Sequence, residues 1–197
     1  MTRVFLLPGD TFRVVVLLAT LLSTLLSAQA MSAPLGEEMW TPDDAHQSAV
    51  RTLADSAERL VAGLYQAVTF DSGTMPAWEN VKAMFHKNAV IVLRTSKDSM
   101  TVFSLEGFVK DFVDFIDRFH AEKTGFTERV LRMKPLVFGD IAHVLVLYEA
   151  SIPGSSRPPQ KGVDSFQLIR QGGRWWIVSI VNELPLNKYP IPAELLE

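Results

Sequence analysis

The sequence predicts an α+β protein in which helices cover one face of a strongly bent antiparallel sheet. Two long segments, residues 42–67 and 105–119, carry apolar residues at three- and four-residue steps, which is the period of an amphipathic helix. From residue 126 onward the apolar runs are short, rich in β-branched residues and separated by turn residues, as in strands. Helices and strands that are segregated along a chain in this way favour the α+β class.

The first long helix has a clear start signal. Thr41 can cap it, Pro42 suits its first turn, and Asp43 and Asp44 favour the positive end of the helix dipole. One apolar stripe then follows the helix, formed by Val50, Leu53, Ala57, Leu60, Val61 and Leu64.

A turn, a short helix, a strand and a loop connect the two long helices. Residues 71–73 (Asp-Ser-Gly) form the turn, and Pro76 opens a short helix over residues 77–85. Residues 89–93 are apolar and partly β-branched, which predicts a strand, and residues 95–99 are polar, which predicts a loop.

The second long helix is the most regular segment of the chain. Ser104 can cap it, and Gly125 is a plausible stop. Its apolar face is rich in phenylalanine and consists of Leu105, Phe108, Val109, Phe112, Phe115, Ile116 and Phe119. A Phe-rich helical face of this kind is more often core than a cofactor site.

Four strands follow, which we expect at residues 126–138, 141–150, 163–170 and 175–181. Pro135 indicates an edge or a bulge in the first of them, and Gly172-Gly173 is a strong hairpin signal between the last two. Residues 141–150 are apolar on both faces, as in a central strand. Residues 184–197 are rich in proline and are expected to form an extended tail.

The N-terminus is expected to be an export signal. Arg3 and Arg13 form a positively charged start before a nearly unbroken apolar run over residues 14–26. Ala28-Gln29-Ala30 then forms a small-x-small cleavage pattern. The run is shorter than the roughly 17–25 residues of a membrane span. We therefore expect cleavage of residues 1–30, with an uncleaved anchor as the alternative. Residues 31–43 are then a flexible leader, and the mature protein is periplasmic or secreted, with no membrane attachment.

Composition excludes several classes of function. The chain has a net charge of −3, which becomes −4 when Arg3, Arg13 and Asp10 leave with the signal, and no Lys/Arg cluster indicates nucleic acid as a partner. There is no cysteine for a disulfide, a thiolate metal site or a thiol nucleophile. We expect no metal site and no cofactor, because phosphate-loop and dinucleotide fingerprints are missing and the histidines lack paired spacing. These histidines are His46, His86, His120 and His143.

Three stretches resemble the nuclear transport factor 2-like superfamily, in particular its SnoaL-like branches. Residues 84–92 (Met-Phe-His-Lys-Asn-Ala-Val-Ile-Val) resemble the segment that leads from the second helix into the first strand. Leu105-Glu106-Gly107, which opens the Phe-rich helix, and residues 162–178, with a Gly turn between the last two strands and Trp175-Trp176 after it, are also similar. The resemblance covers residues 44–183 and implies a cone, in which three helices pack on a curved antiparallel sheet.

The resemblance does not select a function. Members of the superfamily include isomerases, dehydratases, cyclases, small-ligand binders and association domains. The ketosteroid isomerase scheme needs a Tyr donor, an Asp base and a protonated Asp. Tyr65 is suitably placed on the first helix, but residues 89–93 contain no matching Asp. The paired histidines of the scytalone dehydratase type cannot be placed either, so neither mechanism is carried over.

Three residues are candidates for catalysis: Asp164, His86 and Tyr65. Asp164 shares a strand face with Phe166 and Leu168, and apolar walls would raise the pKa of its carboxyl toward that of a general base. The alternative is a loop-end aspartate that bonds local backbone. His86 could act as a base or ligand donor, or as a structural histidine that bonds the turn. Tyr65 could donate a hydrogen bond to a substrate.

A second set of residues is expected to line a ligand cavity: Trp78, Phe112, Tyr148, Phe166, Trp175 and Asn182. Tyr148 lies on the opposite face of its strand from His143 and Glu149, which are too far apart to touch. These two could each line a pocket, or face solvent or a dimer partner. Trp175 and Trp176 point to opposite faces, so one of them is expected in the core.

Three functions remain open. The first is non-catalytic binding of a small, mostly apolar molecule inside the cone. The second is a lyase or isomerase that acts on an apolar carbonyl compound by general acid/base catalysis. The third is a protein-association domain. Homodimerisation through the open sheet face is expected in each case, because residues 141–150 are apolar on both sides.

Overall fold

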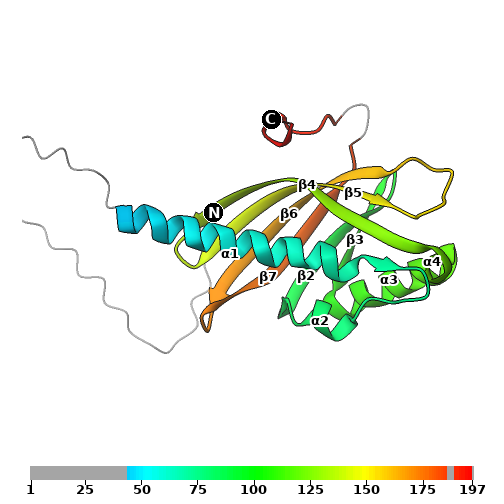
Figure 1. Cartoon of the computed structure of the whole chain (residues 1–197), viewed down its shortest axis with the longest axis horizontal. Coiled ribbons are helices and arrows are strands. Elements are labelled where there is room, and N and C mark those ends of the chain that lie inside the picture. Colours follow the sequence, from blue (N-terminus) through cyan, green and yellow to red (C-terminus); the bar gives the residue numbers. More distant parts are fainter. Residues whose placement is uncertain (1–43, 186–188, 197) are drawn as a thin grey trace, which may run out of the picture. The chain divides into compact units, whose positions relative to one another are not determined.

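The structure, a computed structural model, describes residues 44–185 and 189–196. Its long helices and strands follow the predicted order (Figure 1). The elements are α1 (Asp44–Val68), β1 (Phe70–Asp71), α2 (Trp78–Lys82), β2 (Phe85–Ser96), β3 (Ser99–Ser104), α3 (Leu105–Phe119), α4 (Ala121–Thr124), β4 (Gly125–Phe138), β5 (Ile141–Ser151), β6 (Gln160–Gln171), β7 (Arg174–Glu183) and the one-turn 3-10 helix η1 (Ala193–Leu195).

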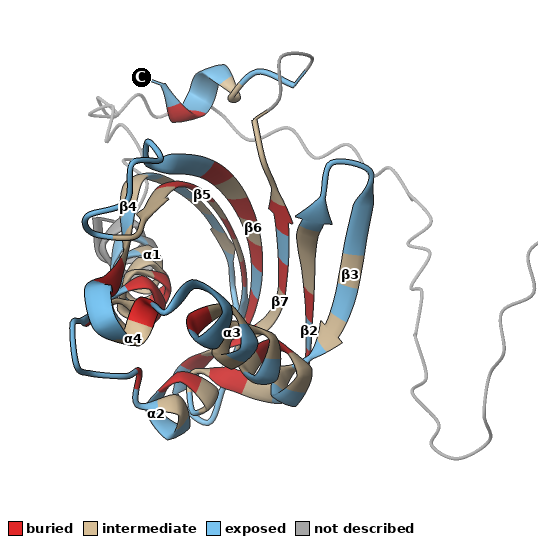
Figure 2. Ribbon diagram, turned by 90° about the vertical axis from the view of Figure 1, so that its right-hand side faces the viewer, coloured by how far each residue is buried: buried red, intermediate tan, exposed pale blue. Residues whose placement is uncertain are grey.

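The strands form one curved sheet in the order β1-β4-β5-β6-β7-β2-β3. All neighbouring strands are antiparallel except β2 and β7, which run parallel. The helices α1 to α4 lie on the concave side of this sheet (Figure 2). The predicted α+β class, with helices on one face of a bent sheet, is therefore confirmed.

The apolar stripe of α1 packs against the sheet, as its helical period predicts. Ala57, Val61, Leu64 and Val68 are buried on this face, and Tyr65 is buried beside them. The expected cap and first turn of the helix at residues 41–43, the signal at 1–30 and the leader at 31–43 lie outside the described residues.

The region between the long helices differs from the prediction in three ways. Asp71, expected in a turn, belongs to the two-residue strand β1, which pairs with β4. The helix expected over 77–85 spans only Trp78–Lys82, and the first long strand already begins at Phe85, which places His86 within β2. The segment expected as a loop, 95–99, is the tight end of a hairpin in which β2 pairs with β3. The β3 strand is at the sheet edge and alternates between exposed and half-buried positions, so it carries no continuous apolar run that sequence periodicity could detect.

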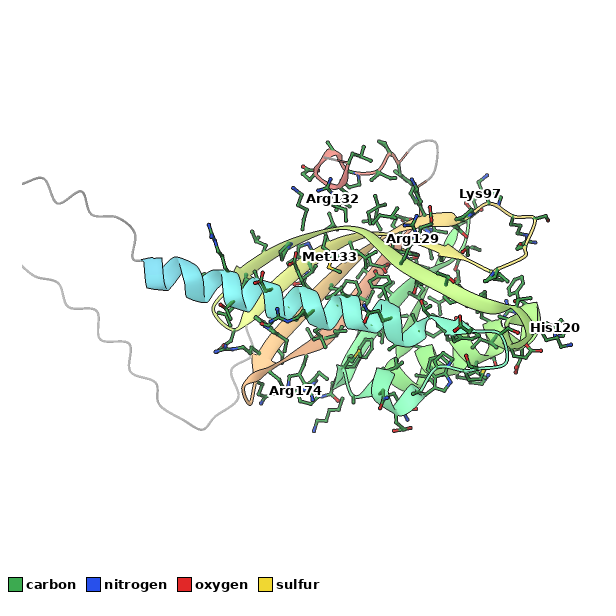
Figure 3. All side chains as sticks on the ribbon, in the orientation of Figure 1. Lys97, His120, Arg129, Arg132, Met133 and Arg174 are labelled. Atoms are coloured by element: carbon green, nitrogen blue, oxygen red, sulfur yellow. The ribbon has the colours of Figure 1, made fainter. Side chains whose placement is uncertain are left out.

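Helix α3 begins as predicted and ends earlier. The Ser104 hydroxyl accepts a hydrogen bond from the Gly107 backbone N–H at 3.2 Å. The helix stops at Phe119 because His120 adopts a left-handed conformation with φ of 53° at the corner that leads to α4 (Figure 3). Gly125 instead opens β4, where a Cβ atom would come within 2.8 Å of the Phe70 carbonyl oxygen.

The interior is filled at one end and open at the other. At the end where β6 meets β7 in a hairpin, Phe85, Leu168, Trp175 and Ile177 are all buried. The opposite ends of β6 and β7, around Asp164 and Asn182, border a cavity. The cavity on the concave side therefore lies at the second end.

The C-terminal segment is not simply extended. The η1 turn at Ala193–Leu195 buries Leu195 at 2 % exposure and contacts β4. Within the described ranges, no helix is both long enough and apolar enough to cross a membrane.

Candidate functional site

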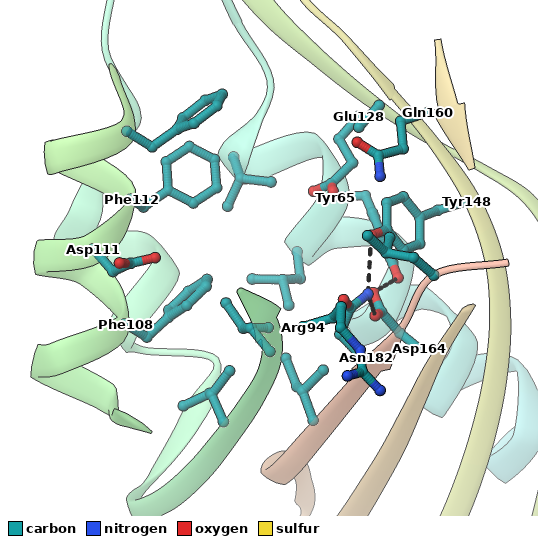
Figure 4. Close-up of a pocket in the computed structure, with 18 of the residues that line it drawn as sticks. Tyr65, Arg94, Phe108, Asp111, Phe112, Glu128, Tyr148, Gln160, Asp164 and Asn182 are labelled. Carbon is teal, nitrogen blue, oxygen red and sulfur yellow. Dashed lines mark hydrogen bonds between the residues drawn. The ribbon is translucent and has the colours of Figure 1, made fainter. Parts of the chain in front are cut away.

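A cavity of about 330 Å³ lies between α1, α3 and the concave face of the sheet (Figure 4). Its walls are mainly apolar and include seven aromatic rings, those of Tyr65, Phe108, Phe112, Phe115, Phe126, Tyr148 and Phe166. Six charged or amide side chains also reach it: Arg94, Asp111, Glu128, Gln160, Asp164 and Asn182. Concave apolar walls with a few convergent polar groups are typical of small-molecule sites.

Asp164 is the centre of a buried hydrogen-bond network. It is 8 % exposed, and the neighbouring Asn182 is 6 % exposed. The Tyr65 hydroxyl donates to Asp164 Oδ2 at 2.6 Å. The Asn182 amide donates to Asp164 Oδ1 at 2.7 Å and to the Tyr148 hydroxyl at 2.9 Å (Figure 4).

Strand register explains why these groups meet. Asp164 of β6 lies directly opposite Val146 of β5 on one side and Asn182 of β7 on the other. Tyr148 is two residues beyond Val146 and therefore points to the same concave face. Tyr65 reaches the same point from α1, which crosses this face of the sheet.

Gly162 makes room for the Tyr148 ring. The two residues are cross-strand partners in β5 and β6. A Cβ atom on Gly162 would lie 2.3 Å from both Cζ and the hydroxyl oxygen of Tyr148. The ring of Tyr148 thus lies across the bare backbone of Gly162, and a side chain at position 162 would displace it.

Burial alters the acidity of this network. It raises the pKa of Asp164 to about 6, although the hydrogen bonds from Tyr65 and Asn182 act in the opposite direction. Burial, followed by the charge of Asp164, raises the pKa values of Tyr65 and Tyr148 well above their usual range. Both phenols therefore remain protonated at neutral pH; Tyr65 donates its proton to Asp164, whereas Tyr148 accepts from Asn182.

A second carboxyl group faces the cavity from β4. Glu128 is half-buried as a whole residue, but its carboxyl end points inward (Figure 4). Burial, and then the charge of Asp164, raises the pKa of Glu128 to about 8. Among the described residues, no hydrogen bond or ion pair holds the Glu128 carboxyl.

Arg94, the one basic residue among the described lining, is already paired. Arg94 Nε donates to Glu183 Oε1 at 2.8 Å, and Arg94 Nη2 contacts the second oxygen of the same carboxylate. This bidentate pair occupies the Nε/Nη2 edge of the guanidinium and offsets its charge.

Six of the sequence candidates come together in this cavity, namely Asp164, Tyr65, Phe112, Tyr148, Phe166 and Asn182. Three lie elsewhere. His86 Nδ1 accepts a hydrogen bond from the Asn88 backbone N–H at 3.3 Å, as expected of a structural histidine that bonds nearby backbone. Trp78 lies outside the cavity lining and packs edge-to-face on Phe112. The buried Trp175 donates its Nε1–H to the Ser56 hydroxyl at 2.9 Å, outside the cavity.

The two other polar candidates on β5, His143 and Glu149, do not line the cavity. Each bonds to a neighbouring strand, His143 Nδ1 to the Gln167 amide nitrogen at 2.7 Å and Glu149 to Arg129 at 3.0 Å. Sequence reasoning overlooked Glu128, Arg94 and Asp111. A signal did exist for Glu128, because it alternates with Phe126 and Val130 on one strand face, where a carboxylate is unexpected.

No family model and no curated protein matches this sequence. Solved structures do match it in fold. An NTF2-like protein with a cystatin-like fold from Novosphingobium aromaticivorans aligns with a TM-score of 0.57 at 14% identity, over 79% of this chain and 96% of that chain. A protein of unknown function with a cystatin-like fold from Nostoc punctiforme aligns with a TM-score of 0.54 at 14% identity, over 71% and 94%.

A further match is provisionally named a scytalone dehydratase, also from Novosphingobium aromaticivorans. It aligns with a TM-score of 0.53 at 12% identity, over 76% of this chain and 94% of that chain. At such identities the likeness shows the fold alone. It agrees with the fold that the sequence resemblance implied.

Proposed function

Starting from this nuclear transport factor 2-like fold, we propose that the cone binds a small, mostly apolar molecule whose polar group meets the Asp164 network. The observation that carries the proposal is the buried carboxyl of Asp164 at the base of a cavity with aromatic walls. The Tyr148 hydroxyl accepts from Asn182, and its own proton has no acceptor among the described residues. That proton is available to a ligand.

The shape of the site supports binding of a compact molecule. The aromatic rings of the wall offer a large apolar contact area at low cost in side-chain entropy. Burial of apolar ligand surface against them contributes about 25 cal/mol per Å² to the free energy of binding, before the cost of association is subtracted. Asp164, Asn182 and Tyr148 lie together on one side of the cavity. A ligand with one polar end would therefore bind in a single orientation.

Native mass spectrometry of the protein, purified without detergent from its own source, tests this proposal. We expect a discrete extra mass that disappears on denaturation. An Ala150→Phe variant, which places a ring in the cavity wall, should lose this adduct. Ala83→Phe, at an exposed position outside this cavity, is the matched control and should retain it. An adduct that survives Ala150→Phe in a folded protein would contradict binding in the cone.

A second candidate function is general acid/base catalysis by a lyase or isomerase on an apolar carbonyl compound. The observation that favours it is the pair of carboxyls with raised pKa values. With a pKa of about 6, Asp164 is mostly ionised at pH 7 and suits a base, whereas Glu128, at about 8, is mostly protonated and suits an acid. Tyr148 would donate to the carbonyl oxygen as negative charge develops there.

Substitution of Asp164 separates the two candidates. Asp164→Asn should abolish any turnover of a carbonyl substrate while ligand binding persists, because asparagine retains the shape but is no base. If the variant turns over substrate at the wild-type rate, Asp164 is not the base. His86 has no part in this scheme.

Export and self-association remain predictions. The expected homodimer would use the outer sheet face, where Val102, Leu136 and Ile141 are more than half exposed. Light scattering on the mature protein measures the assembly directly, and a monomer at micromolar concentration would contradict it. Fractionation of the source cells checks the periplasmic or secreted location.

A further inference from the structure

We propose that the ligand of this cavity is an organic cation, a small apolar amine or quaternary ammonium whose charge lies between Glu128 and Asp164. The proposal rests on the binding function above and names its ligand class. It is independent of catalysis. Three observations support it: the acidic groups of the wall that have no ion-pair partner, the carboxyl of Glu128 that has no hydrogen-bond partner, and the aromatic lining.

Among the described residues of the cavity wall, the charged or chargeable groups that have no ion-pair partner are carboxyls and phenols. Asp111 on α3, Glu128 on β4 and Asp164 on β6 reach the cavity from three separate elements (Figure 4). The only basic residue among the described lining is Arg94, and both of its donor nitrogens on one edge are bound to Glu183. Once these carboxyls are ionised, an anionic ligand would meet like charges, whereas a cation would meet charges of opposite sign.

Glu128 lacks a partner that a cation would supply. Its carboxyl points into the cavity without a hydrogen bond or ion pair from any described residue, whereas Asp164 is held on both oxygens. A carboxylate in such a place is costly unless it is paired. An ammonium group between the two carboxyls would pair with Glu128 directly and with the remaining lone pairs of Asp164.

The rings around these carboxyls also favour a cation. The Tyr65 and Tyr148 rings lie next to each other, with centroids 5.7 Å apart and a tilt of 38°, and the Tyr65 hydroxyl contacts Asp164. A cation within about 6 Å of an aromatic centroid is attracted by the ring face, by about 0.5–2 kcal/mol. The phenylalanines of α3 on the opposite wall would hold the apolar part of the same ligand.

A matched pair of probes separates charge from shape. Phenyltrimethylammonium and tert-butylbenzene have nearly the same shape, and only the first is charged. Calorimetric titration of the full mature chain at pH 8 should show that the cation binds at least tenfold more tightly. Glu128→Gln should reduce this preference about tenfold, whereas Asp117→Asn, which removes an exposed charge from the outer side of α3, should leave it unchanged.

The pH dependence supplies a second readout that needs no variant. The groups that share the cavity with Glu128 are Asp164, Tyr65, Tyr148, Asp111 and Arg94. The charge of the probe does not titrate, and Asp164 is largely ionised above pH 7. Because Glu128 has a pKa of about 8 in the empty cavity, the cation should bind about tenfold more tightly at pH 9 than at pH 7, with release of a proton.

Each outcome decides the inference. Tighter binding of the cation, with a rise toward pH 9 and loss in Glu128→Gln, supports it. Equal or tighter binding of tert-butylbenzene overturns the cation and leaves the proposed binding function standing. If neither probe binds, the cation inference is overturned, and the native adduct measured by mass spectrometry decides the binding function separately. A cation preference that is unchanged in Glu128→Gln, or flat from pH 7 to 9, removes Glu128 from the site and refutes the proposal.

Discussion

Replacing Gly162 by alanine tests whether the bare backbone at this position holds Tyr148 in the polar network. The new Cβ would lie 2.3 Å from the Tyr148 ring, whereas carbon atoms in contact are separated by about 3.5–4.0 Å. The ring must therefore move by about 1.2 Å or more. The hydrogen bond from Asn182 to the Tyr148 hydroxyl, now 2.9 Å, would be broken by such a shift.

The cost follows from two contributions. Overpacking of the new Cβ against the Tyr148 ring costs about 1–3 kcal/mol, and loss of the hydrogen bond adds about 1 kcal/mol. We expect Gly162→Ala to lower the free energy of unfolding by about 2–4 kcal/mol. For a domain of this size, that lowers the melting temperature by about 4–16 °C.

A double-mutant cycle with Tyr148→Ala measures the effect cleanly. Once the ring is absent, Gly162→Ala should be neutral or stabilising by up to about 1 kcal/mol, since alanine restricts the unfolded chain. Urea denaturation of the four proteins gives the coupling energy, which we expect to be about 2–4 kcal/mol. If Gly162→Ala costs the same in both backgrounds to within about 0.5 kcal/mol, the ring is not what requires glycine, and the reasoning is refuted.

Two further predictions concern the acidic network, and a third concerns His86. Burial raises the pKa of Asp164 from 3.8 to about 6, so the folded state binds the proton more tightly, and stability falls as pH rises from about 4 to 6, by about 3 kcal/mol. Asp164→Asn should remove this part of the pH dependence, as measured by denaturation at pH 4 to 7; an unchanged slope would assign it to other groups. Tyr65→Phe removes a hydrogen bond that lowers the pKa of Asp164, so the pKa should rise above about 6 in a carboxyl-carbon NMR titration, and a lower value would contradict the assignment. His86→Ala should change ligand affinity less than about twofold, well under the roughly 1.4 kcal/mol of a tenfold effect, because His86 lies outside the cavity; a larger loss would return it to the site.

Periodicity predicted the elements whose burial repeats regularly. The stripe on α1, the Ser104 cap of α3 and the four strands after residue 125 are present in the structure, because each of these elements buries one face along its length. The hairpin of β2 and β3 escaped prediction, since β3 is an edge strand with no fully buried residue. The parallel pairing of β2 with β7 also escaped, because it joins strands that are distant in sequence.

Individual site residues were predictable only as candidates. The shared face of Asp164, Phe166 and Leu168 was visible in strand parity, and all three are buried in the structure. The alternation of side chains along a strand could not show which face is concave, because a bulge reverses the alternation. Such a bulge lies between Val130 and Arg132 in β4. Glu128 lies before this bulge, where it shares the inward face of β4 with Phe126 and Val130.

The sequence by itself determined the class of fold, the order of the long elements and the absence of cysteine chemistry, because these depend on local periodicity and on composition. Only the tertiary structure decided which polar groups meet. Tyr65 and Asp164 are 99 positions apart in the chain, and their contact depends on the strand order, the sheet curvature and the crossing of α1. It likewise decided that Arg94 is paired and that Glu128 is not. Such contacts result from the packing of the whole domain, and no local pattern encodes them.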